Sequence, residues 1–470
     1  MASPQPRRIT GTHVYSYVKC RHLASLDLHL SRAERRPAHA WEEFAAKRGR
    51  DFEDEYVATL DAVQPEYPER DFEAGAAATG LMLREGVSLV HQAVLQREDR
   101  LGLPDLLRRV DGESALGKHH YEVLDVKTSG RTRGDQVLQV VFYTRLLAEL
   151  QERMPEHGAI ILKDGREERF LIADYLAAHD EVVTALRRLR DGEESSRPFF
   201  QLGCRSCYHD HRCMPEMTRA KDLSLVQGMS HGALRILEAS GCESIEDLAT
   251  FHPSDARARG NLDATLLRRL RRAAHASLLG KAVVEQRPRA EKLERAAIVH
   301  ALLDPFADRV LAFGVMHPAA RDGNFRHVLP RSRDEEWGCF RELLQELPQR
   351  APLLHFGVGL RRWHEEHAFA RDADPTLEAR LIDLQKRLRT AAIYPAPVVL
   401  LEDFVRSALG RDPHRHGHSG AAAMWTLQEE GDKRLIDKLH GDLLDLAELK
   451  EQVLDASAAP PPSAGRQAQA

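Results

Sequence analysis

The chain has 470 residues, a formal net charge of −5 and a pI near 6.6, so it has no overall attraction to nucleic acid. A hydrophobic share of 43% with 30% charged residues is ordinary globular composition. No stretch approaches the ~18 to 20 uninterrupted apolar residues of a membrane helix, and the N-terminus lacks the apolar core of a signal peptide. We therefore expect a cytoplasmic protein without membrane contact, with about three domains at roughly 150 residues each.

The first 225 residues combine helical and strand patterns. Residues 9 to about 60 have helical periodicity, and strand signals follow between 85 and 175, where the turn dipeptide Asp164-Gly165 predicts a hairpin. Between the strands, "DQVLQVVFYTRLLAELQERM" carries apolar residues at helical spacing. Interleaved strands and helices predict an α/β core.

The remaining chain divides into three segments. Residues 226–285 read as a helix, a turn at Gly241, a short helix and a basic helix, which resembles a helix-hairpin-helix element and equally fits a helical linker. In residues 286–455 a β-hairpin and several helices predict a second α/β domain. Residues 456–470 are small and Pro-rich, so we expect a disordered tail.

Three of the six cysteines lie within ten positions, in "CRSCYHDHRC", as Cys204, Cys207 and Cys213. In a reducing compartment such spacing indicates a metal or redox site rather than a disulfide. A tetrahedral site needs a fourth ligand, and zinc would accept one of three nearby histidines, His22, His209 or His211. Otherwise we expect His209 and His211 to be solvated loop residues. Cys242 and Cys339 have no partner at metal spacing and are expected to be buried apolar residues.

A set of polar residues stands in strand and helix patterns upstream of these cysteines. In "YEVLDVKTSG", Asp125 and Lys127 alternate with apolar residues, so on a strand they project from the same face. Asp105 follows Pro104 and precedes an apolar run, as in a turn that aims a carboxylate inward. Gln139 and Tyr143 lie four residues apart on one helix face.

Farther upstream, Glu53 follows Gly49 by four residues on an expected helix. In this order the acids, the lysine and the Gln-Tyr pair resemble the RecB-type PD-(D/E)xK nucleases. With Cys20 ahead of them and the three clustered cysteines behind, residues 13–213 are similar to the iron-sulfur branch, which includes CRISPR-associated and AddB-type nucleases. The resemblance implies a restriction-endonuclease-like α/β domain over residues 1–225.

The same resemblance implies a [4Fe-4S] cluster as a cofactor. Cys20 would be the fourth ligand, and the cluster would staple the N-terminal helix to the end of the nuclease core. The expected ligands are Cys20, Cys204, Cys207 and Cys213. Zinc at this site is the alternative.

The resemblance also implies how a catalytic Mg²⁺ or Mn²⁺ is held. Asp105, Asp125 and the Val126 carbonyl would ligate the ion, and Glu53 would complete or orient its shell. Most RecB-type nucleases have histidine at the position of Glu53, but a carboxylate oxygen suits these hard ions at least as well. This departure leaves open which of the metal ions the site prefers.

Three further side chains receive roles from the resemblance. Lys127 would position the attacking water and stabilise developing charge, and Gln139 with Tyr143 would orient the lysine or the substrate phosphate. Arg131 and Arg133 lie in the loop after the strand, where contact with backbone phosphates is one interpretation and a flexible basic loop, the more common case for a single arginine, is the other.

The C-terminal domain resembles RNase H-like exonucleases of the DEDD kind, whose acids bind two metal ions. At the corresponding positions this chain has His300, Leu302 and Leu360, while Asp383 remains. Asp442 or Asp445 stands for the last acid, and His440 replaces the usual tyrosine. We expect a catalytically inactive domain that binds nucleic acid, docks a partner or covers the nuclease. An unrelated α/β domain is the alternative.

These expectations add up to a metal-dependent DNA nuclease, an exonuclease on single-stranded ends, acting in DNA repair, recombination or defence. Single-stranded or duplex DNA ends are the expected partners. The chain has no Walker-type G-x-x-x-x-G-K-[ST] sequence, so a helicase partner would supply any unwinding. The alternative is a noncatalytic nucleic-acid-binding or scaffold protein that retains the nuclease fold.

Overall fold

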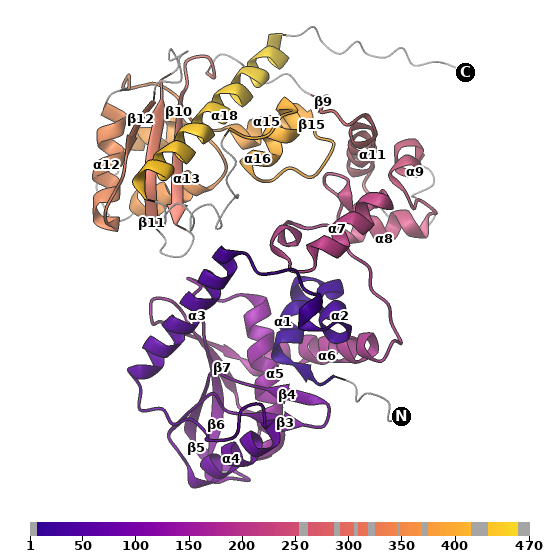
Figure 1. Cartoon of the computed structure of the whole chain (residues 1–470), viewed down its shortest axis with the longest axis vertical. Coiled ribbons are helices and arrows are strands. Elements are labelled where there is room, and N and C mark those ends of the chain that lie inside the picture. The colour runs from indigo at the N-terminus through magenta and orange to yellow at the C-terminus, as the bar shows by residue number, and fades with distance from the viewer. Residues whose placement is uncertain are drawn as a thin grey trace. The chain divides into compact units, whose positions relative to one another are not determined.

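A computed structural model describes residues 7–252, 262–285, 292–304, 309–317, 325–345, 347–368, 375–414 and 431–458. The protein has a mixed α/β fold and forms two compact units (Figure 1). The first unit comprises Met1–Ala38 and Glu42–Met214, and the second comprises His39–Trp41 and Pro215–Ala470. No helix in the described ranges is long and apolar enough to cross a membrane. The predicted tail falls almost entirely outside these ranges.

A five-stranded mixed sheet forms the centre of the first unit. Its strands, in spatial order, are β2 (Leu89–His91), β5 (Leu106–Ser114), β6 (Gly117–Val126), β7 (His157–Ile161) and β8 (Glu167–Leu171). β6 is antiparallel to β5 and parallel to β7. The β7–β8 hairpin confirms the predicted turn, with Gly165 at a φ of 76°.

Helices cover both faces of this sheet, which buries the central strand β6 on both sides. The helix α5 (Gly134–Gln151) connects β6 to β7 and packs against Tyr121 and Val123 (Figure 1). The helix α3 (Ala40–Ala58) contributes Phe52 and Tyr56 to the apolar cluster on the other face, around Leu124. The end of β6 therefore lies in an environment from which water is largely excluded.

The other elements of the first unit hold its N-terminus against α5. They include a small sheet and further helices, namely β1 (Ile9–Thr10), β3 (Leu95–Arg97), β4 (Arg100–Gly102), α1 (Gly11–Lys19), α2 (Arg21–His29), α4 (Phe72–Glu85), α6 (Leu176–Arg190), and the 3₁₀ helices η1 (Arg32–Glu34), η2 (Ile172–Tyr175) and η3 (Leu202–Ser206). A Cβ on Gly11 would lie 2.5 Å from the Tyr143 hydroxyl, so only glycine lets α1 approach α5 this closely.

The second unit starts with short helices. They are the second half of α7 (Asp210–Arg219), η4 (Leu223–Leu225), α8 (His231–Ala239), α9 (Ile245–Thr250) and α11 (Ala264–Leu279). Gly241, between α8 and α9, has a φ of 81°, the left-handed conformation that glycine adopts without strain. The predicted succession of a helix, a glycine turn and a short helix is therefore present.

A second mixed sheet follows, with five strands and helices on both faces. Its spatial order is β12 (Phe325–Val328), β11 (Arg309–Met316), β10 (Ala297–Asp304), β13 (Leu353–His355) and β14 (Leu381–Asp383). The antiparallel pair β10–β11 confirms the predicted hairpin. One face packs against α18 (Asp432–Ala458), which crosses the strands in Figure 1, and the other against α12 (Arg333–Gln345) and α13 (Gly359–Ala368).

Small elements complete the second unit around this sheet. They are β9 (Val283–Val284), α14 (Pro375–Arg380), α15 (Leu384–Ala391), β15 (Ala392–Ile393), α16 (Leu401–Phe404) and the π-helical turn η5 (Val405–Leu409). β9 and β15 pair antiparallel as a separate two-stranded sheet.

Candidate active site and cysteine-lined cavity

Two neighbouring strands of the first unit bring Asp105, Asp125 and Lys127 together. Asp105 directly precedes β5, and the antiparallel register pairs Leu106 with Leu124, next to Asp125 near the end of β6. The Val126 amide donates to Asp105 Oδ2 over 2.7 Å. Lys127 Nζ lies 3.8 Å from Asp105 Oδ2 and forms a closer ion pair with Asp125 Oδ2. The acids and the amine thus share one site.

Burial strongly perturbs these three groups. Asp125 is only 1% exposed, and its Oδ2 accepts no well-directed hydrogen bond from the described residues although it lies beside Lys127. Burial, with the charge of Asp105, raises the pKa of Asp125 well above its usual value. Burial likewise raises the pKa of Asp105, although Lys127 opposes this shift. Such a buried acidic pair is typical of functional sites and has the donor chemistry of a hard divalent cation.

Lys127 and its surroundings determine which of these groups carries a proton. Burial alone would lower the pKa of Lys127, but Asp125 and Asp105 more than offset it, so the pKa is raised. Lys127 is therefore an ammonium at neutral pH and can donate hydrogen bonds but not accept a proton.

Glu53 lies within electrostatic reach of this pair. It is on α3 as predicted, and its charge raises the pKa of both Asp105 and Lys127. Glu53 Oε1 accepts a hydrogen bond from Gln92 Nε2 at 2.5 Å and lies 3.3 Å from His91 Nε2. A Cβ on Gly49 would meet nothing within 4 Å, so the structure gives no steric reason for that glycine.

Gln139 and Tyr143 contact each other on α5, as their spacing predicts. Gln139 Nε2 donates to Tyr143 Oη over 2.9 Å. Burial raises the pKa of Tyr143, and the charges of Asp125 and Asp105 raise it further, which shows that the ring lies near the acids. Tyr143 therefore stays protonated beside the site.

Sequence reasoning missed His91 and Gln92, because their partner Glu53 lies far away in the chain and no local pattern links them. For Arg133 the sequence left phosphate contact and a flexible basic loop open, and in the structure its guanidinium pairs with Asp135 and donates to Tyr15 Oη at 3.4 Å. Arg131 is exposed.

A separate cavity of about 540 Å³ in the first unit is lined by all four predicted cysteine ligands. Cys20 caps the start of α2, Cys204 lies in η3, Cys207 ends it, and Cys213 is on α7. Backbone amides donate to three of the sulfurs, from Leu23 to Cys20 at 3.4 Å, from Gln201 to Cys204 at 3.4 Å and from His209 to Cys207 at 3.5 Å. Such donors stabilise cluster thiolates.

Burial raises the pKa of Cys204 and Cys207, so without a metal these two side chains are thiols. Burial raises the pKa of Cys207 to about 11, and the nearby Cys20 and Cys204 contribute, although the His209 amide opposes the shift. A cation would therefore have to displace protons on binding. In the described part of the chain, no three His, Cys, Asp or Glu side chains are placed closely enough around one point to hold a metal ion.

The histidines of the zinc alternative differ in position. His22 lines the same cavity as the cysteines, with its Nδ1 3.0 Å from Ser196 Oγ, whereas His209 and His211 do not line it. The expectation that His209 is solvated is wrong, because its side chain is fully buried against Tyr208 and 3.5 Å from Asp27. His211 is exposed, as expected.

Asp27 explains the burial of His209. Its carboxylate is 4% exposed and accepts hydrogen bonds from Ser16 at 3.1 Å, Arg35 at 2.7 Å and Tyr208 at 2.7 Å. This network ties α2 to the residues just after Cys207, so the protein itself holds the two ends of the cysteine set together.

In the second unit, the acids with predicted metal positions have other partners. Asp442 Oδ2 lies 3.2 Å from His300 Nε2, and its Oδ1 accepts from Lys438 Nζ at 2.5 Å. Asp445 pairs with Arg411 at 2.9 Å and His414 at 2.7 Å.

The other positions that the resemblance singled out in this unit are Asp383, Leu302 and Leu360. Asp383 caps α15 by accepting from the Lys386 amide at 3.3 Å, and it also accepts from the Gly357 amide at 3.2 Å. Leu302 and Leu360 are buried apolar side chains. Each remaining acid therefore serves an ion pair or a helix cap.

No protein-family model matches this chain, and no curated protein is significantly similar to it.

Proposed function

We propose that the first unit is a metal-dependent DNA nuclease with a PD-(D/E)xK core. The observation that carries this proposal is the buried contact of Asp105, Asp125 and Lys127 at adjoining ends of two strands. Buried like charges cost stability and are retained where chemistry requires them. The mixed sheet with α5 on one face supports the same fold.

Mg²⁺ or Mn²⁺ fits this site because of the donors present. Carboxylates of Asp105 and Asp125 and the Val126 carbonyl would hold it, with Glu53 nearby, and the poorly satisfied Oδ2 of Asp125 would gain a partner. When bound, such an ion neutralises phosphate charge and acidifies water.

The protein's own side chains would orient the substrate and stabilise the charge that develops during cleavage. Lys127, as an ammonium, donates to the attacking water or to a phosphate oxygen and offsets charge that develops there. Tyr143, held protonated and paired with Gln139, orients Lys127 or the scissile phosphate. Since Lys127 and Tyr143 both carry protons, neither removes the proton from water.

We also propose that the cysteine-lined cavity holds a [4Fe-4S] cluster. Four sulfurs around one cavity, three of them with backbone N–H donors, suit soft iron ligation. The ligands come from the α1–α2 junction and from residues 204–213, so the cluster would have the structural role of a staple.

For the second unit we propose an inactive RNase H-like domain. Lys438 pairs with Asp442 and Arg411 pairs with Asp445, so a cationic side chain stands at each place where an active enzyme would bind a cation, and His300 and His414 contact the same two carboxylates. Single-stranded or duplex DNA ends are the proposed substrate of the whole protein, in repair, recombination or defence.

The test is cleavage of single-stranded and duplex DNA with Mn²⁺ or Mg²⁺ by wild type, Asp125→Asn and Lys127→Ala. Matched controls are Asp111→Asn and Lys118→Ala, exposed residues toward the other ends of the same two strands. We expect each site variant to lose activity by about 10³-fold or more, and each control to cut like wild type. Undiminished cleavage by both site variants contradicts the assignment. Tight DNA binding without any cleavage by wild type favours the noncatalytic alternative.

A further inference from the structure

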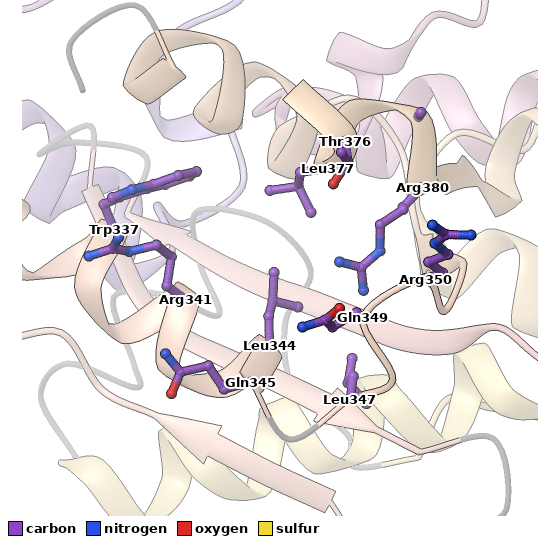
Figure 2. Close-up of a pocket in the computed structure, with 11 residues that line it drawn as sticks. Trp337, Arg341, Leu344, Gln345, Leu347, Gln349, Arg350, Thr376, Leu377 and Arg380 are labelled. Carbon is purple, nitrogen blue, oxygen red and sulfur yellow. The ribbon is translucent and has the colours of Figure 1, made fainter. Parts of the chain in front are cut away.

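The second unit has a pocket of about 770 Å³ between α12, the segment 347–350 and α14 (Figure 2). Its described lining consists of Trp337, Arg341, Leu344, Gln345, Leu347, Gln349, Arg350, Thr376, Leu377, Ala379 and Arg380. None of the acids discussed above lines it. The pocket is therefore separate from the inactive RNase H-like positions of the same unit.

The floor of the pocket is apolar and fixed. Trp337, Leu347 and Leu377 are 4%, 6% and 2% exposed and belong to the apolar cluster under α12. They pack against core residues such as Phe340, so their positions are set by the fold. These side chains therefore form a fixed apolar wall, of which a small part is open to the pocket.

The rim is cationic. Arg341, Arg350 and Arg380 line the pocket, and no described lining residue is acidic (Figure 2). In the described part of the chain, no ion pair joins Arg341 or Arg350 to a carboxylate, and both side chains are exposed. Glu378, adjacent in sequence to the lining, is instead paired with Arg361 at 2.9 Å. Arg341 and Arg350 thus present positive charge that no acid among the described lining residues neutralises.

Further polar groups complete the lining. Arg380 Nε donates to the Ala351 carbonyl at 2.9 Å, which fixes its guanidinium at the pocket wall. Gln345, Gln349 and the Thr376 hydroxyl add neutral donors and acceptors. Arginine binds phosphate through two parallel hydrogen bonds, which makes such a rim a phosphate site rather than a site for a bare apolar ligand.

We infer that this pocket binds a nucleotide, with its phosphate at the arginine rim and its base on the floor formed by Trp337 and the leucines. The nucleotide is either free or part of a single strand, since both offer the same phosphate and base. This inference does not rest on the proposed nuclease function, because the pocket lies wholly in the second unit.

The test uses the full chain in a Lys127→Ala background, so that an oligonucleotide stays intact. Binding of fluorescein-labelled (dT)₈ and of adenosine monophosphate is measured for the parent, for Arg341→Glu with Arg350→Glu, and for a control pair, Arg295→Glu with Arg387→Glu. The control arginines are exposed residues of the same unit outside the pocket. We expect the pocket pair to weaken binding about tenfold or more and the control pair to leave it unchanged. Thermal melting of each variant shows whether it is folded.

Photo-crosslinking with 8-azidoadenosine monophosphate locates the site independently. We expect the label on peptides that contain residues 333–350 or 375–380 of the parent. Competition by adenosine monophosphate identifies a free nucleotide as the ligand, whereas binding of (dT)₈ alone identifies a strand, and either supports the inference. Equal competition by inorganic phosphate, labelling elsewhere, absence of binding by both probes, or equal binding by folded pocket and control variants overturns it.

Discussion

The buried Asp125 carboxylate combines a cost in stability with a proposed catalytic use. Its pKa is raised, so the folded protein binds this proton more tightly than the unfolded chain does. The resulting contribution to stability is fully present below the ordinary pKa of 3.8 and is lost as pH rises through the raised value. At pH 8 and without metal, the raised pKa therefore costs stability relative to a carboxyl group with an ordinary pKa.

From this we predict that Asp125→Asn abolishes cleavage and stabilises the metal-free protein at pH 8. The amide does not ionise and therefore removes this cost, for a gain of about 1 kcal/mol, or roughly 2–4 °C in melting temperature. Thermal melts in a chelator at pH 8 and pH 4 measure the effect, which should shrink at pH 4. Asp111→Asn is the exposed control. If Asp125→Asn melts at a lower temperature than wild type at pH 8, the predicted direction of the stability change is wrong.

Local spacing predicted part of this site and missed the rest. Alternation on a strand placed Asp125 beside Lys127, and a four-residue step on a helix placed Gln139 beside Tyr143. The contacts of Glu53 with His91 and Gln92 join residues from different elements. The contact between Asp27 and the buried His209 does the same. Such contacts depend on tertiary packing, for which a single sequence carries no periodic signal.

Among the elements, the junction of α1 and α2 depends on Cys20. Cys20 caps α2 and, among the described residues that line the cavity, is the only cysteine that precedes the five-stranded sheet of the first unit in the chain. We predict that Cys20→Ser, purified anaerobically, loses at least about fivefold in iron and sulfide per chain, because three thiolates hold a cluster poorly. Cys339→Ser, outside the cavity, should keep wild-type content. Stoichiometric zinc in wild type, lost in His22→Ala, would instead establish a Cys3His zinc site.

The turn between β3 and β4 is tied to α6 by one carboxylate. Asp99 accepts from Arg187 Nη2 at 2.8 Å and from Arg190 Nη1 at 2.6 Å. These hydrogen bonds, with Arg187 the larger contributor, hold the pKa of Asp99 well below its ordinary value despite partial burial. Its contribution to stability is therefore present above pH 3.8 and is lost as pH falls through the depressed value.

We predict that Asp99→Asn lowers the free energy of unfolding by about 1–2 kcal/mol at pH 7, with partial exposure keeping the loss moderate. Denaturant unfolding at pH 7 and pH 3 checks this, and the difference should be smaller at pH 3. Glu98→Gln, in the same turn and 79% exposed, is the matched control and should change stability by less than about 0.5 kcal/mol. If Asp99→Asn loses more unfolding free energy at pH 3 than at pH 7, this ion pair is not the cause of the loss.

Element patterns predicted both hairpins and the α/β class, since turn dipeptides and apolar alternation are local signals. The small sheet was not predicted, because its parallel pairing of Ile9 with Arg100 joins β1 to β4 across α1 to α4. The proposed nucleotide pocket was not predicted either, because its arginines come from three separate segments, namely α12, a connecting segment and α14. The periodicity of a single sequence does not show which distant segments come together in the fold.

In the whole protein, we expect the first unit to carry out all DNA cleavage and the second unit to carry out none. Lys127→Ala should therefore abolish cleavage by the full chain, and Asp383→Ala should leave it unchanged, because Asp383 caps α15 and lacks acidic neighbours at the positions of Leu302 and Leu360. The measurement is the rate of single-stranded DNA degradation with Mn²⁺. Lys386→Ala, an exposed residue on the same helix, controls for surface changes. Residual activity of Lys127→Ala that disappears only when Asp383→Ala is added would show that the second unit is itself a nuclease.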